Sequence, residues 1–337
     1  MRENIIKSLS FFLIVSFLFA GSAFAQSQLK DVVQEKTLLE TKKLYKPQPG
    51  FKIYATAATF GGYDSNVKLT NNRKGDTFEE MMFSLSVAKP MGNGFKFTFD
   101  YDLDALNYNR ITDASNILNH FRLGPSKKFG KFTLGTGYDL GIFYYPKNED
   151  STFLFHKGYI FLTQDISKRT YHRLQFYYGY KDFTDNKAMG DTLGSLQDKT
   201  RADRRFDVEY KISSQLTKKL KLSSRSSFAI NNSNAKYQDF YDYKSYTQTA
   251  RAEYKLLKNT LFFTDFSYMR KLYTTRLVTN GDYKEVDGLY SGNIGITQKL
   301  NKHNLLTVYY TYRQNASNDL FELYSESMVN CGWQYIF

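Results

Sequence analysis

Residues 95–104 read FKFTFDYDLD, and this short stretch decides the fold. Its odd-numbered positions are phenylalanine, tyrosine or leucine, whereas the positions between them are lysine, threonine or aspartate. Successive side chains of a β-strand point to opposite faces, so a period of two predicts a strand with one apolar and one polar face. The same alternation returns along the chain, notably in residues 132–144, 174–180, 206–212, 262–268 and 306–312.

Applied to the whole chain, the pattern predicts an all-β fold of about fourteen strands. The connections between them alternate in length, with tight turns such as residues 90–94 and 301–304 and longer polar loops, the longest being Asp185–Asp203. Short turns at one end and long loops at the other are typical of outer-membrane barrels. The predicted strands cover residues 51–69, 78–89, 95–108, 117–125, 131–145, 152–166, 171–184, 204–217, 220–231, 244–257, 260–274, 288–300, 305–315 and 323–337.

Strand length favours a membrane barrel over a soluble sandwich. Many predicted strands have about 12 residues or more, whereas soluble strands have about 5–6 and barrel strands need about 9–11 to cross a bilayer. Aromatic pairs such as Tyr144-Tyr145 and Tyr309-Tyr310 lie near strand ends, where membrane interfaces concentrate such rings. In hydrocarbon every backbone polar group must be paired, so the sheet must close. The sequence therefore predicts a closed antiparallel transmembrane β-barrel.

Composition excludes a helical membrane protein, because the chain is 23% charged and each spanning helix needs about 20 largely apolar residues. The one long apolar run, Leu9–Ala20, follows Arg2 and Lys7 and precedes Ala23-Phe24-Ala25, an order that predicts a cleaved signal peptide over residues 1–25. The single cysteine, Cys331, excludes an internal disulfide and a cysteine-bound metal cluster.

Residues 26–50 differ from everything after them. Their leucines and valines approximate a helical stripe, which Pro47 and Pro49 would end. We expect a short periplasmic helical extension and linker here, followed by the barrel domain over residues 51–337. Two interpretations stay open for the extension: a frayed leader, or a plug or partner-docking helix in residues 28–44.

The chain ends in CGWQYIF, with Trp333, Tyr335 and Phe337 on one parity. This ending resembles the C-terminal signal by which Gram-negative outer-membrane barrels are delivered to their insertion machinery. The resemblance implies an outer-membrane location, with lipid and that machinery as partners. The string GYDSNV at Gly62–Val67 also resembles the opening strand in the barrels of surface lipoprotein assembly modifiers.

If the apolar parity faces lipid, the polar parity lines the interior. That face mixes acidic and basic side chains with a mild basic excess, which predicts a porin-like channel for passive diffusion of small hydrophilic solutes or ions. The alternative is an assembly or export barrel with a periplasmic partner. The candidate pore-lining residues are Asp100, Asp102, Asp104, His120, Arg122, Asp139, Arg173, Lys181, Arg205, Lys211, Arg251 and Arg313.

The sharpest local feature is the row of Asp100, Asp102 and Asp104 on one strand face. Hairpin geometry brings His120 and Arg122 opposite this row, so pairing would relieve the repulsion between the carboxylates. The row is either a cation-binding rung or a self-neutralised structural ladder. The loop Asp185–Asp203 likewise has two interpretations, as an inward constriction or as a surface loop.

Enzymatic function is not expected, since no G-x-S-x-G, H-E-x-x-H, phosphate-loop or dinucleotide motif is present. Of the four histidines, His172 and His303 fall at predicted turns, and His156 has no serine or acid companion at matching depth. His120 faces the aspartate row, which would permit an Asp/His pair acting on water, but this single pairing does not make a catalytic triad. We therefore expect no cofactor and no metal. The net charge is +13, but it is scattered without a basic block, so a nucleic-acid partner is not expected either.

Overall fold

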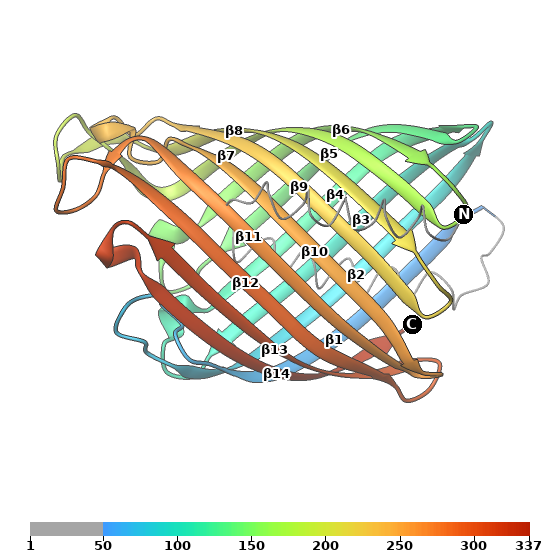
Figure 1. Ribbon diagram of the computed structural model, residues 1–337. Coiled ribbons are helices and arrows are strands. Elements are labelled where there is room, and N and C mark those ends of the chain that lie inside the picture. Colours follow the sequence, from blue (N-terminus) through green and yellow to red (C-terminus); the bar gives the residue numbers. More distant parts are fainter. Residues whose placement is uncertain (1–49) are drawn as a thin grey trace, which may run out of the picture.

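Residues 50–337 are described by the computed structural model, and they form one sheet of fourteen antiparallel strands closed into a barrel (Figure 1). The predicted fold class and strand number are confirmed. The strands are β1 (Lys52–Asp64), β2 (Asp76–Gly92), β3 (Phe95–Tyr108), β4 (Asn116–Phe129), β5 (Phe132–Tyr144), β6 (Phe153–Asp165), β7 (Thr170–Met189), β8 (Leu196–Gln215), β9 (Leu220–Ser233), β10 (Tyr243–Leu257), β11 (Thr260–Leu277), β12 (Lys284–Lys299), β13 (Asn304–Ser317) and β14 (Tyr324–Ile336).

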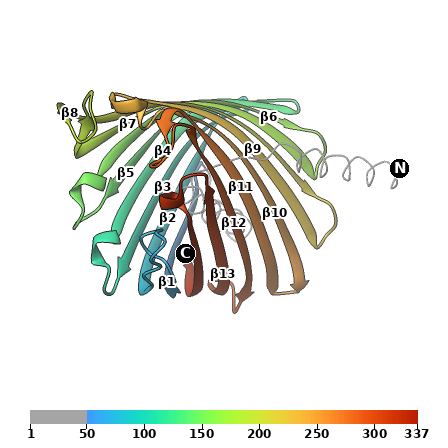
Figure 2. The same cartoon turned by 60° about the vertical axis from the view of Figure 1, so that its left-hand side comes forward.

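Closure depends on the pairing of the first strand with the last. Each strand pairs with its neighbours in sequence, and β1 pairs with β14 from Thr56 opposite Ile336 to Asp64 opposite Met328. Figure 2 shows β1 beside the strands that end the chain. The sheet consequently has no open edge, and its ladder can satisfy the backbone polar groups without water.

The two ends of the barrel differ in their connections. The turn end, where β1 begins and β14 finishes, has tight turns such as residues 93–94 and 130–131. Asn93 and Gly130 have positive φ angles of 48° and 60°, as the tight hairpins of twisted strands require. The opposite, loop end carries the longer connections, with short 3-10 helices η1 (Thr112–Ala114), η2 (Glu149–Ser151), η3 (Tyr237–Asp239) and η4 (Leu320–Glu322).

The predicted long loop over Asp185–Asp203 is wrong in extent. β7 continues to Met189 and β8 begins at Leu196, so most of this stretch is a paired strand extension. Its polar residues lie beyond the apolar band, where both faces of a strand can be wet and the alternation that marks the other strands disappears. The first strand was also placed too long, since β1 ends at Asp64 rather than near residue 69.

The two faces of the wall differ as the alternation predicts. Outward side chains are large and apolar yet exposed, for example Phe266 (48%), Ile294 (48%) and Val308 (46%). Their inward neighbours are polar and buried, such as Asp265 (5%) and Asn293 (7%). An apolar band around the outside of a closed barrel, with polar groups within, is the transmembrane arrangement.

Helices contribute nothing to spanning in the part of the chain described. Between residues 50 and 337, no helix has the length and apolar character needed to cross a membrane. The predicted signal peptide over residues 1–25, the helical extension over residues 26–50 and the partner-docking segment 28–44 fall outside the described residues, apart from Gly50.

The GYDSNV string lies where β1 leaves the barrel at its loop end. Asp64 accepts a hydrogen bond from the Asn66 amide (2.8 Å) and another from the Tyr108 hydroxyl (2.9 Å). The Asn66 side chain donates to the carbonyl oxygen of Ser325 on β14 (3.0 Å), and Val67 packs with buried neighbours that include Tyr108. The string thus fastens the seam between β1 and β14, while its resemblance to assembly modifiers stays a prediction.

The orientation of the wall predicts how two adjacent substitutions differ. Phe266→Arg places a cation on the apolar outer face of β11, where it costs about 2–4 kcal/mol near the bilayer midplane. Ser267→Arg places the same cation on the inner parity, where polar neighbours accommodate it. We expect Phe266→Arg to lower the folded fraction in lipid far more than Ser267→Arg, measured by heat-modifiable gel migration and urea titration. Equal losses would contradict the assigned faces.

Candidate functional site

The candidate residues all lie on the inner face of the barrel wall. On β3, Asp102 and Asp104 are buried (5% and 0% exposed), whereas the outward Phe97 is 37% exposed. None of the twelve sequence candidates is an exposed residue. Buried or half-buried positions hold Asp100, Asp102, Asp104, His120, Arg122, Asp139, Arg173, Lys181, Arg205, Lys211, Arg251 and Arg313.

The predicted register between β3 and β4 is confirmed. Asp100 lies opposite Arg122, and Asp102 lies opposite His120. Across this register His120 Nδ1 lies 4.0 Å from Asp102 Oδ2, and Asp100 also accepts a hydrogen bond from the Ser86 hydroxyl (2.5 Å).

Asp139 on β5 contacts basic side chains from both neighbouring strands. Its carboxylate receives His120 Nε2 and Arg122 Nε (3.6 Å) from β4, and Lys157 Nζ (3.2 Å) from β6. One histidine, one arginine and one lysine from two strands thus surround a single carboxylate that is only 1% exposed. Such convergence offsets the desolvation of a charge in the wall.

Similar pairs recur around the barrel. Arg205 donates to Asp207 (2.7 Å) and to the Tyr243 hydroxyl (3.2 Å). Arg251 bridges Glu253 (2.7 Å) and Asp265 (3.0 Å), joining β10 to β11. Elsewhere on the inner face of the barrel, Arg225 pairs with Glu209 and Arg313 pairs with Glu326. Arg173 stacks on the aromatic ring of Phe161.

The sequence missed several charged residues that belong to this face. Lys157 lies on β6, whose sequence FLFHKGYIFL is apolar on both parities and so hides which side is inner. Arg201 and Asp203 were assigned to a loop, and Asp287 was placed just before its strand. Residues 196–205, LQDKTRADRR, show no alternation of apolar and polar side chains, so the sequence carries no signal that assigns Arg201 and Asp203 to a strand.

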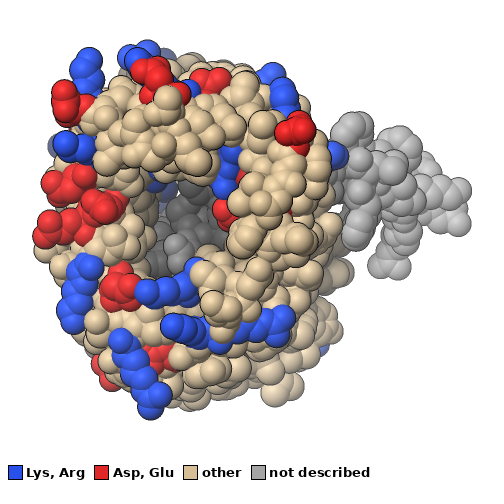
Figure 3. Space-filling model, turned by 90° about the vertical axis from the view of Figure 1, so that its left-hand side faces the viewer, with Lys and Arg blue, Asp and Glu red and all other residues tan. Residues whose placement is uncertain are grey.

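The interior widens into a cavity of about 640 Å³ towards the loop end. Seen from that end, the molecule is hollow, and its rim carries both Lys or Arg and Asp or Glu side chains (Figure 3). The lining includes His120, Asp139, Lys181, Arg205 and Lys271, together with many aromatic rings. A volume of this size suits a small organic solute.

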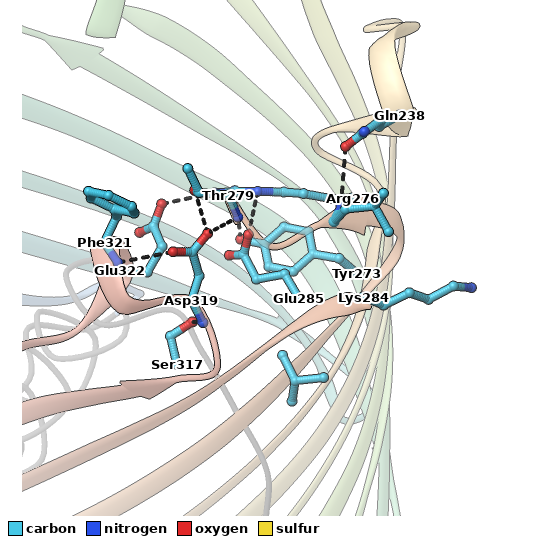
Figure 4. Close-up of polar contacts among 12 residues, drawn as sticks. Gln238, Tyr273, Arg276, Thr279, Lys284, Glu285, Ser317, Asp319, Phe321 and Glu322 are labelled. Atoms are coloured by element: carbon cyan, nitrogen blue, oxygen red, sulfur yellow. Dashed lines mark hydrogen bonds and ion pairs between the residues drawn. The ribbon is translucent and has the colours of Figure 1, made fainter. Parts of the chain in front are cut away.

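Loops at the mouth are tied to one another by a second polar cluster (Figure 4). Arg276 at the end of β11 forms an ion pair with Glu285 on β12 (2.6 Å) and donates a hydrogen bond to Glu322 in η4 (2.8 Å). Asp319, which caps η4, accepts from the Thr279 amide (2.7 Å), the Thr279 hydroxyl (2.6 Å) and the Phe321 amide (3.0 Å). These contacts hold the connection between β13 and β14 against the one between β11 and β12.

The titration of Asp319 reflects these contacts. Burial alone raises the pKa of its carboxyl, but the hydrogen bonds from Thr279 and Phe321 and the charge of Arg276 outweigh burial and leave the pKa below its ordinary value. A carboxyl with a lowered pKa contributes stability above its unfolded pKa of about 3.9, and that contribution disappears as the pH falls through the folded value.

No metal site is formed by the described part of the chain, because residues 50–337 contain no group of three or more His, Cys, Asp or Glu side chains placed to hold an ion. His156 lies on the outer face of the barrel, where its ring contacts the Tyr138 hydroxyl at 2.5 Å. It is therefore separated from the charged residues of the inner face.

Comparison with known proteins supports the fold but does not identify a function or a site. No protein family model matches this chain, and no curated protein matches it. Among solved structures, it is similar to an anion-selective porin from Comamonas acidovorans, with a TM-score of 0.50, 11% identity, and 85% of this chain and 99% of that chain covered. It is also similar to the outer-membrane channel DcaP of Acinetobacter baumannii, with a TM-score of 0.50, 12% identity, and 87% and 99% covered.

A third similar structure is OmpT, an outer-membrane protein of Vibrio cholerae, with a TM-score of 0.50, 8% identity, and 87% of this chain and 100% of that chain covered. At such low identities these likenesses establish a shared architecture. The fold is that of outer-membrane porins and channels.

The mouth cluster generates a prediction about loop order. Asp319→Ala removes the side chain that caps η4 and the three hydrogen bonds that it accepts. We expect the local free energy of opening to fall by about 1–2 kcal/mol, so that the amides of Phe321 and Thr279 exchange about five- to thirtyfold faster near pH 7. In the unaltered protein this protection should persist when the pH is lowered to about 4.5, because the carboxyl pKa is depressed. Hydrogen exchange checks both points.

Asp282→Ala is the matched control, since Asp282 is an exposed acid in the adjoining loop. Exchange at the two amides should be unchanged in this variant. Equal exchange in Asp319→Ala and Asp282→Ala would show that the cap does not order the mouth.

Proposed function

We propose that this chain is an outer-membrane, porin-like channel for the passive diffusion of small hydrophilic solutes or ions. The observation that carries the proposal is the closed barrel with a polar, charged inner face that widens into a cavity of about 640 Å³. Fourteen strands enclose more space than eight, whose interior side chains just fill the barrel.

The charges of the inner face support passage of solutes of either sign. Acids and bases stand in cross-strand pairs, as with Arg251 and Asp265 or Arg225 and Glu209, so each charge is held at a fixed height and angle. Such a wall solvates polar solutes by fixed dipoles and charges and requires no cofactor or chemical step. In this proposal the candidate residues named above line the pathway.

The outer face supports a location in the outer membrane, with lipid as its immediate partner. Exposed aromatic rings lie near both ends of the strands, including Tyr144 and Tyr312 towards the loop end and Phe129 and Phe132 at the turn end. Trp333 and Phe337 are exposed on the outer parity of β14 (45% and 58%), available to the barrel-insertion machinery that the proposal includes as a partner.

Planar-bilayer recording of the purified protein tests the proposal. We expect steady, ohmic conductance steps in KCl, and we expect them to survive deletion of residues 26–46 because the barrel wall alone forms the path. A barrel that inserts but never conducts, either whole or without residues 26–46, would contradict the proposal and favour the alternative of an assembly or export barrel.

Measuring charge selectivity tests whether an individual residue, Asp102, lies on the pathway. Asp102→Asn removes a luminal negative charge while keeping side-chain shape, so the reversal potential in asymmetric KCl should shift towards greater chloride preference. Glu79→Gln is the control, because Glu79 is an exposed acid on the outer parity of β2. Identical reversal potentials for Asp102→Asn and the unaltered protein would remove Asp102 from the pathway.

A further inference from the structure

One wall of the loop-end cavity alternates aromatic rings with cations. The run crosses from β5 to the connection between β9 and β10, and all of its members line the cavity: Phe143, Phe153, Lys181, Phe183, Arg201 and Tyr241. No sequence motif marked it, because its members come from four strands and a loop.

The contacts along this run are close and continuous. Phe143 stacks on Phe153 with ring centroids 4.3 Å apart. Lys181 Nζ lies 3.6 Å from the Phe153 centroid and 4.3 Å from the Phe183 centroid. The Arg201 guanidinium carbon lies 4.5 Å from the Phe183 centroid and 3.2 Å from that of Tyr241. Ring quadrupoles attract both cations, which fixes them against the wall.

The charges in the run do not balance. Asp203 lies directly opposite Lys181 in the β7–β8 register, but both of its oxygens are held by Arg201, at 3.0 and 2.6 Å. Across residues 50–337, no ion pair within 4.0 Å involves Lys181. Two basic side chains therefore share one carboxylate, and Lys181, which lines the cavity, has no acid of its own.

A second lysine on the cavity wall shows the contrast. Lys271 also lies between two rings, those of Tyr243 (4.6 Å) and Tyr273 (4.1 Å). It stands opposite Asp287 on β12, so this position has one acid for one base. At this position the number of acids equals the number of bases, whereas at the Lys181 wall two bases share one acid.

We propose that the Lys181 wall is a binding site for small aromatic carboxylates. The solute's carboxylate would take the free donors of Lys181, and its ring would pack against the Phe143–Phe153 pair in offset or edge-to-face contact. A cavity of about 640 Å³ holds a single-ring acid with room for water. This inference rests on the proposed function, because it names a solute class for the same pathway.

The rings distinguish this site from a generally cationic wall. An inorganic anion or an aliphatic acid could use the charge of Lys181 but would gain nothing specific from phenyl faces. Offset or edge-to-face contact of an aromatic ring with Phe143 and Phe153 contributes about 0.5–1.5 kcal/mol (about two- to tenfold in affinity) beyond the burial of apolar area, and an aliphatic ring of similar size does not gain this contribution. Affinity should therefore require both the charge and the aromatic face of the solute.

Isothermal titration calorimetry on the full chain in detergent tests this with benzoate, cyclohexanecarboxylate and benzamide as probes. Benzoate should bind about two- to tenfold more tightly than cyclohexanecarboxylate, which has the charge without the aromatic face. Benzamide, which has the ring without the charge, should bind at least about tenfold more weakly than benzoate. Equal affinities for the three probes, or no measurable binding of benzoate, would overturn the proposal without any mutation.

Two matched variants locate the site. Lys181→Gln should weaken benzoate binding at least about tenfold, since a charge-assisted hydrogen bond is lost. Lys221→Gln also removes a lysine of the inner parity, but Lys221 pairs with Glu253 (3.3 Å) and does not line the cavity, so benzoate binding should be unchanged. Equal weakening in both variants would reduce the effect to general electrostatics and overturn the assignment to Lys181.

The readouts separate this inference from the channel proposal. Conductance steps in KCl without any preference for benzoate would leave the channel standing and overturn the site. Binding of benzoate that depends on Lys181, in a barrel that never conducts, would support the site and overturn the channel. Heat-modifiable gel migration confirms that each variant is folded before either measurement.

Discussion

The pairing of backbone N–H and C=O groups is the constraint on which the structure depends. In an apolar surrounding an unpaired group costs several kcal/mol, so a spanning sheet can have no edge. Pairing of β1 with β14 meets this requirement, and Asp64 and Asn66 fasten the same seam at the loop end. Once the sheet is closed, the period of two assigns every side chain to one of two environments.

The inner environment brings its own cost, because charges on the wall lose part of their hydration. The barrel offsets this by placing acids and bases on adjacent strands at matching heights, as with Asp139, which contacts His120, Arg122 and Lys157. Charges left over from this pairing are therefore informative. Lys181 is such a case, since the carboxylate opposite it belongs to Arg201.

The architecture was predictable from the sequence, because alternation as in residues 95–104 reports both the strand and its faces. The placement of His120 and Arg122 opposite the aspartate row also followed from hairpin geometry. The charge network was less predictable, since Lys157 lies on a strand that is apolar on both parities, and Arg201 lies beyond the apolar band. Contacts such as Arg276 with Glu322 join residues far apart in sequence through loop conformations that no periodicity encodes.

The native cysteine offers the most direct test of the central claim that one parity faces lipid and the other water. Cys331 is exposed on the outer parity of β14, whereas its neighbour Asn330 is 1% exposed on the inner parity. A nitroxide attached to Cys331 in lipid bilayers should be accessible to oxygen and shielded from a water-soluble nickel relaxant. A nitroxide attached to Asn330→Cys, in a variant that also carries Cys331→Ser, should instead be accessible to nickel and less accessible to oxygen. Strong nickel relaxation at Cys331 would contradict the account.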